Sequence, residues 1–119
     1  MQDINNLTTA VVEAIQDKKG SKITLLDLTR LDSAPAARLI VCQGKSTSQV
    51  SAIADNIREH VQQATGAKPI HYEGYRNSQW IIIDYGSLTA HVFLPDIRNF
   101  YNLEELWADA EIKELEDLD

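Results

Sequence analysis

The sequence predicts one domain of mixed α/β (α+β) class, with a mixed sheet of about five strands flanked by helices. Two observations lead to this fold class. Apolar residues recur at helical spacing in two long segments, and short runs rich in β-branched and aromatic residues lie between and after them. The expected order of elements is α-β-β-α-β-β-β-α. A chain of 119 residues is long enough to bury one core without disulfides or metals.

The first third of the chain predicts one helix and two strands. Residues 6–18 place apolar side chains on one helical face, and the pattern ends at two lysines followed by Gly20, as helices commonly do. The runs at 22–31 and 38–44 are rich in β-forming residues and flank a turn at 32–35. The second run is apolar throughout, which is typical of a central strand.

A long helix is expected to begin at Ser46 and to end at Gly66. Ser46 and Gln49 have the spacing of a capping box, in which each side chain bonds the backbone amide of the other residue. This helix separates the second strand from a third candidate strand at 69–75, so a parallel crossover can join the two strands.

Residues 80–94 predict a β-hairpin with the two-residue turn Gly86-Ser87. Glycine at the first turn position suits a type II′ turn, which matches the twist of the strands it joins. This turn sets Trp80 opposite Phe93. Side chains alternate between the two faces of a strand, so one face of the hairpin is apolar and is expected to be core. That face carries Ile81, Ile83, Tyr85, Leu88, Ala90 and Val92.

The other face of the hairpin is mixed. It carries Trp80, Ile82, Asp84, Thr89, His91 and Phe93. The segment 80–107, which begins with this hairpin, holds six of the chain's eight aromatic residues. Protein interfaces are enriched in Trp, Tyr, Phe and Arg because these large side chains bury area at low entropic cost. The segment therefore favours a docking surface, while packing of a last helix on the sheet is the alternative for Trp107.

That last helix is expected to start at Asn102, with Glu105 three positions later. We expect a domain at 1–110 and an acidic C-terminal tail at 111–119. From Asn102 onward, eight acidic residues and one basic residue account for the whole net charge of −7. Binding to nucleic-acid phosphates normally requires a basic face, and the composition does not predict one. The acidic end favours solubility or contact with a basic protein.

The sequence predicts a cytoplasmic protein. Its start lacks the features of a signal peptide, and no apolar run approaches the roughly 18 residues of a membrane span. The single cysteine, Cys42, cannot form a disulfide within the chain, which fits a reducing compartment.

Catalytic and metal sites are not evident in the sequence. Nucleotidyltransferases hold two magnesium ions with carboxylates spaced two apart on a strand, but the residues two positions from Asp84 are Ile82 and Gly86. No pair of histidines has metal-ligand spacing, so we expect neither a metal nor a cofactor. One alternative stays open: a nucleotidyltransferase-like enzyme or nucleotide-binding protein that uses Asp84 and His91, with His91 as a general base.

Several separated blocks of the sequence resemble the Iojap or ribosomal silencing factor family. They are WIIIDYG at 80–86, HVF at 91–93, the Arg98 to Trp107 segment, LDL at 26–28, GKSTSQV at 44–50, AIA at 52–54 and EG at 73–74. The resemblance covers residues 7–110, and the blocks fall in the order and spacing of the family.

The resemblance implies a nucleotidyltransferase-like fold without enzymatic activity. It implies a translational repressor that binds the large ribosomal subunit through its fourteenth protein and sterically blocks joining of the small subunit when nutrients are scarce. Relatives in organelles add a link to large-subunit assembly, and a homodimer of the free protein is left open. The docking candidates that match the family's blocks are Trp80, Asp84, His91, Phe93, Arg98, Tyr101, Leu103, Glu104 and Trp107.

Overall fold

The computed structural model describes residues 3–31 and 34–117 and confirms the α/β (α+β) prediction. Half of the turn expected at 32–35 and the last two residues of the expected tail lie outside the described residues. The described elements are α1 (Ile4–Asp17), β1 (Ser21–Asp27), β2 (Arg38–Gln43), α2 (Thr47–Thr65), β3 (His71–Glu73), β4 (Trp80–Asp84), β5 (Leu88–Phe93), α3 (Pro95–Tyr101), α4 (Leu103–Leu106) and β6 (Glu111–Glu114).

The strands form one mixed sheet in the order β3-β4-β5-β2-β1-β6. Strands β2 and β5 pair in parallel, and every other described pair is antiparallel. Because β4 and β5 lie between them, β2 and β3 run in the same direction, as the predicted crossover through α2 requires. None of the helices in the described ranges is long and apolar enough to cross a membrane.

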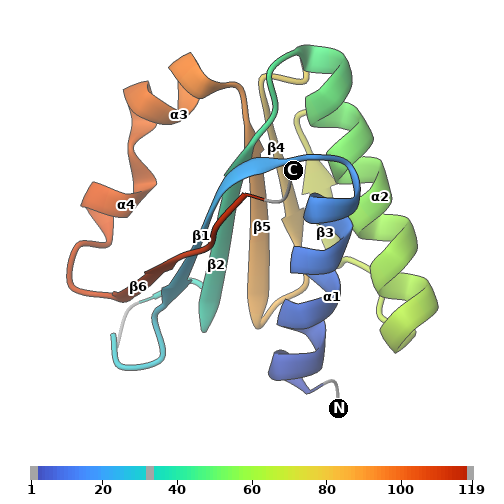
Figure 1. Ribbon diagram of the computed structural model, residues 1–119. Coiled ribbons are helices and arrows are strands. Elements are labelled where there is room, and N and C mark those ends of the chain that lie inside the picture. Colours follow the sequence, from blue (N-terminus) through green and yellow to red (C-terminus); the bar gives the residue numbers. More distant parts are fainter. Residues whose placement is uncertain (1–2, 32–33, 118–119) are drawn as a thin grey trace.

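Helices α1 and α2 lie side by side on one face of the sheet and cover the main core (Figure 1). The hairpin of β4 and β5 has the predicted register, with Trp80 paired to Phe93 and Asp84 to Thr89. Gly86 has a φ of 87°, the positive value that the turn requires. The predicted core face is buried as expected, since the side chains of five of its six residues are 0% exposed: Ile81, Ile83, Leu88, Ala90 and Val92.

Helix α2 begins and ends where the sequence predicts. The Ser46 hydroxyl accepts a hydrogen bond from the Gln49 amide at 3.1 Å, and Gly66 adopts the left-handed conformation with a φ of 78°. The return bond of the capping box differs from the expectation. The Gln49 Oε1 atom accepts from the amide of Lys45 at 2.7 Å.

The opposite face of the sheet has a smaller core under α3 and α4, on the left in Figure 1. Its buried members come from the loop after β1 and from three neighbouring strands: Leu26, Leu28, Leu39, Val41 and Phe93. Helices α3 and α4 are short. On the mixed face of the hairpin, Trp80, Ile82, Asp84 and Thr89 are partly exposed, whereas His91 and Phe93 are buried.

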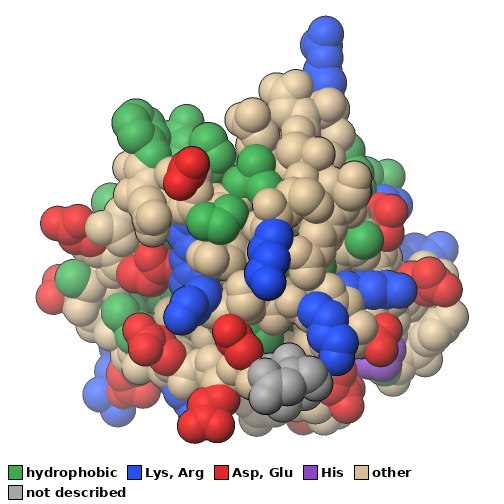
Figure 2. Space-filling model, turned by 45° about the horizontal axis from the view of Figure 1, so that its top comes forward, with side chains coloured by type: hydrophobic (Ala, Val, Ile, Leu, Met, Phe, Trp, Pro, Cys, Tyr) green, Lys and Arg blue, Asp and Glu red, His purple; other side chains and the backbone are tan. Residues whose placement is uncertain are grey.

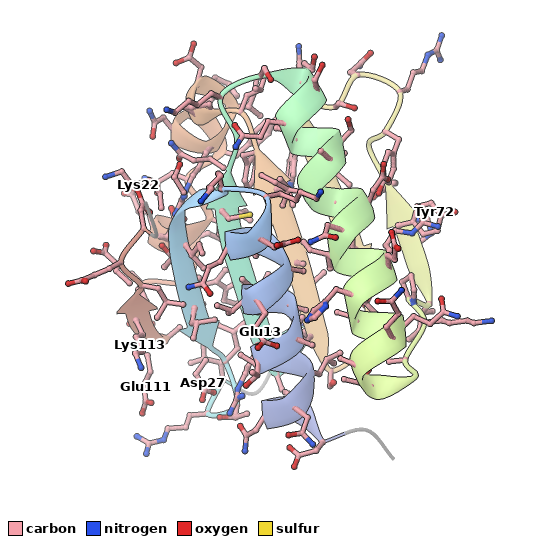
Figure 3. The ribbon with its side chains drawn as sticks, turned by 45° about the vertical axis from the view of Figure 1, so that its right-hand side comes forward. Glu13, Lys22, Asp27, Tyr72, Glu111 and Lys113 are labelled. Carbon is pink, nitrogen blue, oxygen red and sulfur yellow. The ribbon has the colours of Figure 1, made fainter. Side chains whose placement is uncertain are left out.

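The sheet has one strand more than the roughly five predicted, because part of the expected acidic tail is β6. Its residues Glu111–Glu114 pair antiparallel with β1, which places Glu111 beside Asp27 at this edge (Figure 3). Farther along, the Leu115 amide donates to the Ile23 carbonyl at 2.8 Å, and an Asp117 oxygen accepts from the Lys22 amide at 2.8 Å. Backbone pairing to a sheet edge therefore holds a segment whose composition resembles that of a solvated tail.

A helix begins directly after Asn102 as expected, but it is only the short α4, and the sequence did not predict the helix α3 before it. Pro95 starts a first short helix, α3, where its missing amide costs no hydrogen bond. Asn102 then adopts a φ of 46°, which ends α3 before α4 begins. Asparagine tolerates this left-handed conformation better than most residues. Its side chain bonds Glu105 at 2.8 Å instead of capping a backbone amide of α4.

Candidate functional site

Trp80 is the centre of an aromatic cluster that joins the sheet to α3. Its ring lies 4.8 Å from the Phe93 ring and 4.7 Å from the Tyr101 ring, measured between centroids. Its indole N–H donates to Nδ1 of His91 at 3.1 Å. Four of the predicted docking residues are thus brought together. The hairpin register aligns Trp80, His91 and Phe93, and α3 places Tyr101 against Trp80.

Members of this cluster differ in exposure, and this corrects the predicted role of Phe93. Its side chain is 0% exposed, so it cannot contact a partner directly. Tyr101 is 51% exposed and Trp80 is half-buried. Phe93 therefore supports Trp80 from below, while Tyr101 and the outer part of Trp80 face solvent.

Arg98 is likewise buried, at 8% exposure, and holds α3 and α4 against the sheet. Its guanidinium donates to the Lys22 carbonyl at 2.6 Å and to the Thr24 hydroxyl at 2.9 Å, both on β1. It also donates twice to one oxygen of Glu104, at 3.1 and 3.0 Å. The predicted docking residues Arg98 and Glu104 therefore form a partly buried ion pair that positions the surface and contributes little contact area of its own.

The geometry of Asp84 and His91 gives no support to the enzymatic alternative. An Asp84 oxygen accepts from the Gly86 amide at 2.7 Å and so stabilises the hairpin turn. In His91, Nδ1 accepts from Trp80, so the proton of the neutral ring resides on Nε2 and neither nitrogen has a free lone pair to act as a base. Burial also raises the pKa of the Cys42 thiol to about 12, which disfavours a nucleophilic thiolate. Within the described ranges, no group of three or more His, Cys, Asp or Glu side chains could hold a metal ion.

His91 is expected to make folding stability depend on pH. Burial lowers its pKa to about 4, although the Asp84 carboxylate opposes this shift. Between pH 6.5 and 4 the unfolded chain therefore binds more protons than the folded one, and the free energy of unfolding falls as the pH falls. Going from pH 7 to 5 should cost roughly 2 kcal/mol from this histidine alone. Urea unfolding of the wild type and of His91→Asn, which keeps an acceptor for Trp80, measures the effect. An equally steep pH dependence in both proteins would contradict it.

Helix α3 exposes an apolar side chain that continues the aromatic cluster outward, and α4 exposes a second apolar side chain. Phe100 is 79% exposed and lies edge-on to Tyr101 with 5.1 Å between ring centroids, and Leu106 is 68% exposed. Hydrophobic side chains gather at the upper left of the face drawn in Figure 2, in the region of α3. Leu103 and Trp107 pack against the smaller core, which supports the packing interpretation of Trp107, while its docking role stays a prediction.

We define the docking surface as the outward part of Trp80, Phe100, Tyr101 and Leu106. Phe100 and Leu106 are not among the docking residues that the sequence predicts. Both lie in an apolar segment interrupted by acidic residues, but the break at Asn102 decides which side chains of this segment point outward. Glu105 and Asp109 are exposed on the same segment and give this surface negative neighbours.

The whole chain, residues 1–119, matches the family model described as "Ribosomal silencing factor during starvation". The chain belongs to the ribosomal silencing factor family. A relative of that name from Halalkalibacterium halodurans is 39% identical over 110 residues, with 92% of each chain covered. Another from Chromobacterium violaceum is 34% identical and covers 88% of this chain and 84% of its own.

A solved structure agrees with this membership. The crystal structure of a Chromobacterium violaceum protein superposes with a TM-score of 0.84 at 34% identity, covering 89% of this chain and 87% of that one. The resemblance to ribosomal silencing factors predicted from separated sequence blocks is therefore confirmed over the whole domain. The description of the family names a factor that silences ribosomes, and silencing is a regulatory activity.

Proposed function

We propose that this chain is a translational repressor that binds the large ribosomal subunit through its fourteenth protein and sterically blocks joining of the small subunit. The observation that carries the proposal is the docking surface, in which an apolar and aromatic patch lies outside a rigid core. Membership of the ribosomal silencing factor family supplies the ribosome as the target. A related role in large-subunit assembly rests on the resemblance to organellar relatives.

A protein is the favoured direct partner of the docking surface. Phe100, Tyr101 and Leu106 are exposed apolar side chains of the kind that anchor protein interfaces. The acidic residues beside them complement a basic protein and would repel RNA phosphates. Phe93 and the Arg98–Glu104 pair hold the surface in shape before binding, which lowers the entropic cost of association.

Sedimentation with separated ribosomal subunits tests this function. The protein is expected to migrate with the large subunit and not with the small one, and to reduce the fraction of joined ribosomes when the small subunit is added. Failure to migrate with the large subunit, or unchanged joining at saturating protein, would overturn the proposal. Magnesium-dependent binding of a nucleoside triphosphate would favour the enzymatic alternative.

Removing side chains from the docking surface should weaken binding to the large subunit. The double variant Tyr101→Ala/Leu106→Ala is expected to bind at least about tenfold more weakly, because truncating central interface residues commonly costs 2 kcal/mol or more. Its melting temperature should change little, since both side chains are more than half exposed.

The matched control for this variant is Ile70→Ala. Ile70 is also a large exposed hydrophobic residue, at 76%, but it precedes β3 at the far edge of the sheet. Its replacement should leave subunit binding unchanged. Equal affinities for the double variant and the control would show that the docking surface lies elsewhere.

A further inference from the structure

Four of the chain's six lysines converge at the end of the molecule where α1 ends and α2 begins. Lys18 and Lys19 follow α1, Lys22 lies near the start of β1, and Lys45 precedes α2. All four are exposed. Figure 2 shows Lys and Arg side chains near the centre of this face, with acidic side chains beside and around them, and Figure 3 shows Lys22 at the upper end of β1. We call these four lysines the basic end.

The side chain of Gln49 bonds the backbone of three of these lysines. Its Nε2 atom donates to the carbonyls of Lys18 and Lys19 at 3.1 and 3.2 Å, while its Oε1 atom accepts from the amide of Lys45 at 2.7 Å. Gln49 lies in the first turn of α2, so one residue links the end of α1 to the loop that follows β2. The backbone positions of Lys18, Lys19 and Lys45 at the basic end are thus fixed by the fold.

Lys22 is fixed by a separate set of contacts. It has a φ of 52° at an irregularity in the pairing of β1, and its carbonyl accepts from Arg98 while its amide donates to Asp117. Both contacts use backbone atoms, which leaves the ammonium group exposed. Lys22 also lines a cavity of about 640 Å³ together with Asn99 of α3, so the basic end borders the segment that carries the docking surface. The same cavity is lined by the acidic residues Glu114, Glu116 and Asp117, so Lys22 lies at the margin of the basic end.

The ammonium groups of the basic end have no carboxylate partner in the part of the chain that the structure describes. The five ion pairs within 4.0 Å there involve arginine or histidine, and none involves a lysine. Four unpaired positive charges therefore gather on a chain whose net charge is −7. The composition of the chain does not reveal this local clustering of lysines.

We propose that the basic end contacts backbone phosphates of ribosomal RNA while the docking surface holds the protein partner. This inference rests on the proposed function, because the ribosome is what brings RNA beside a bound protein. Exposed, unpaired lysines suit phosphate, since they bind it as point charges and release the counterions condensed on RNA. An acidic protein segment is the competing partner class, but RNA is the predominant polyanion at the surface of a ribosomal subunit. The contact does not depend on the RNA sequence. It increases the affinity of the protein for the large subunit and helps to orient the protein there.

The salt dependence of binding to the purified large subunit tests this contact. Affinity is measured from about 50 to 200 mM salt for the wild type, for Lys18→Gln/Lys45→Gln, and for the control Lys68→Gln/Lys113→Gln, which removes the same charge outside the basic end. Each lost phosphate contact should reduce the slope of log affinity against log salt by about 1. The first variant is therefore expected to lose roughly 2 from the slope, and the control to keep the wild-type slope.

A parallel titration with the isolated fourteenth ribosomal protein identifies the partner class. Lys18→Gln/Lys45→Gln should bind this RNA-free protein as tightly as the wild type does. An equal loss of affinity for the isolated protein would overturn the RNA contact in favour of a protein contact, and an unchanged slope with the subunit would overturn it outright. If the wild type itself fails to bind the subunit, the proposed function fails and the inference with it. Normal binding with an unchanged slope rejects only the phosphate contact.

Discussion

Phe93→Ala is expected to lower the free energy of unfolding by roughly 3–5 kcal/mol, the usual cost of truncating a buried phenylalanine. Phe93 is fully buried, lies in the smaller core, and supports the Trp80 ring. Its removal leaves a cavity under the aromatic cluster that neighbouring strands cannot fill without shifting. Urea or thermal unfolding measures this loss of stability. Binding of the folded fraction to the large subunit should weaken as well, because the Trp80 ring loses the side chain that it packs against.

Phe100→Ala is the matched control, since it makes the same chemical change on an exposed side chain of α3. Its cost in stability should stay within about 0.5 kcal/mol. Similar stability losses for the two variants would mean that the partition of the aromatic residues into core and surface is incorrect. A stable Phe93→Ala protein with weakened binding would instead restore Phe93 to the direct docking role that the sequence predicts.

Arg98→Met is expected to destabilise the protein by roughly 3 kcal/mol, at the low end for breaking a buried ion pair because Glu104 keeps some exposure. The change leaves the Glu104 carboxylate without its ion-pair partner, and the Lys22 carbonyl and the Thr24 hydroxyl each lose a hydrogen-bond donor. Helices α3 and α4 should then loosen from the sheet. Chemical denaturation measures the stability, and hydrogen exchange at the amides of α3 should report the loosening.

Arg30→Met provides the comparison for this prediction. Arg30 also forms an ion pair, with Glu111 at 3.4 Å, but its side chain is 87% exposed and that of Glu111 is 66% exposed. Exposed pairs contribute between about 0 and 1 kcal/mol, so this variant should be nearly as stable as the wild type. Adding Glu104→Gln to Arg98→Met should recover part of the lost stability by removing the unpaired carboxylate charge. No recovery would argue against the ion pair as the cause.

Local patterns predicted the central hairpin accurately. The alternation of apolar residues and the Gly86 turn fix which face of β4 and β5 is core, because a shift by one residue would expose Ile81, Ile83 and Val92 together. The ends of α2 were predictable for the same reason, since Ser46 and Gly66 act through bonds to nearby residues. Such features depend on chain segments shorter than about twenty residues.

Strand β6 could not be predicted in this way. Glu111–Glu114 has an acidic composition typical of a solvated tail, and its strand conformation depends on a partner, β1, some ninety residues earlier in the chain. The interruption at Asn102 is similar. Its left-handed backbone separates α3 from α4, and the Arg98 bonds to β1 and Glu104 hold both helices against the sheet.

The sequence by itself determined the fold class, the core face of the hairpin, the family, and the segment that carries the candidate docking residues. Only the tertiary structure decided which of those residues reach solvent, because the Trp80 ring contacts both the buried Phe93 ring and the exposed Tyr101 ring. It also decided that lysines distributed from position 18 to position 45 share one end, through the bonds of Gln49. The exposure of a side chain and the clustering of charges depend on contacts between residues distant in sequence, so local sequence patterns do not predict them.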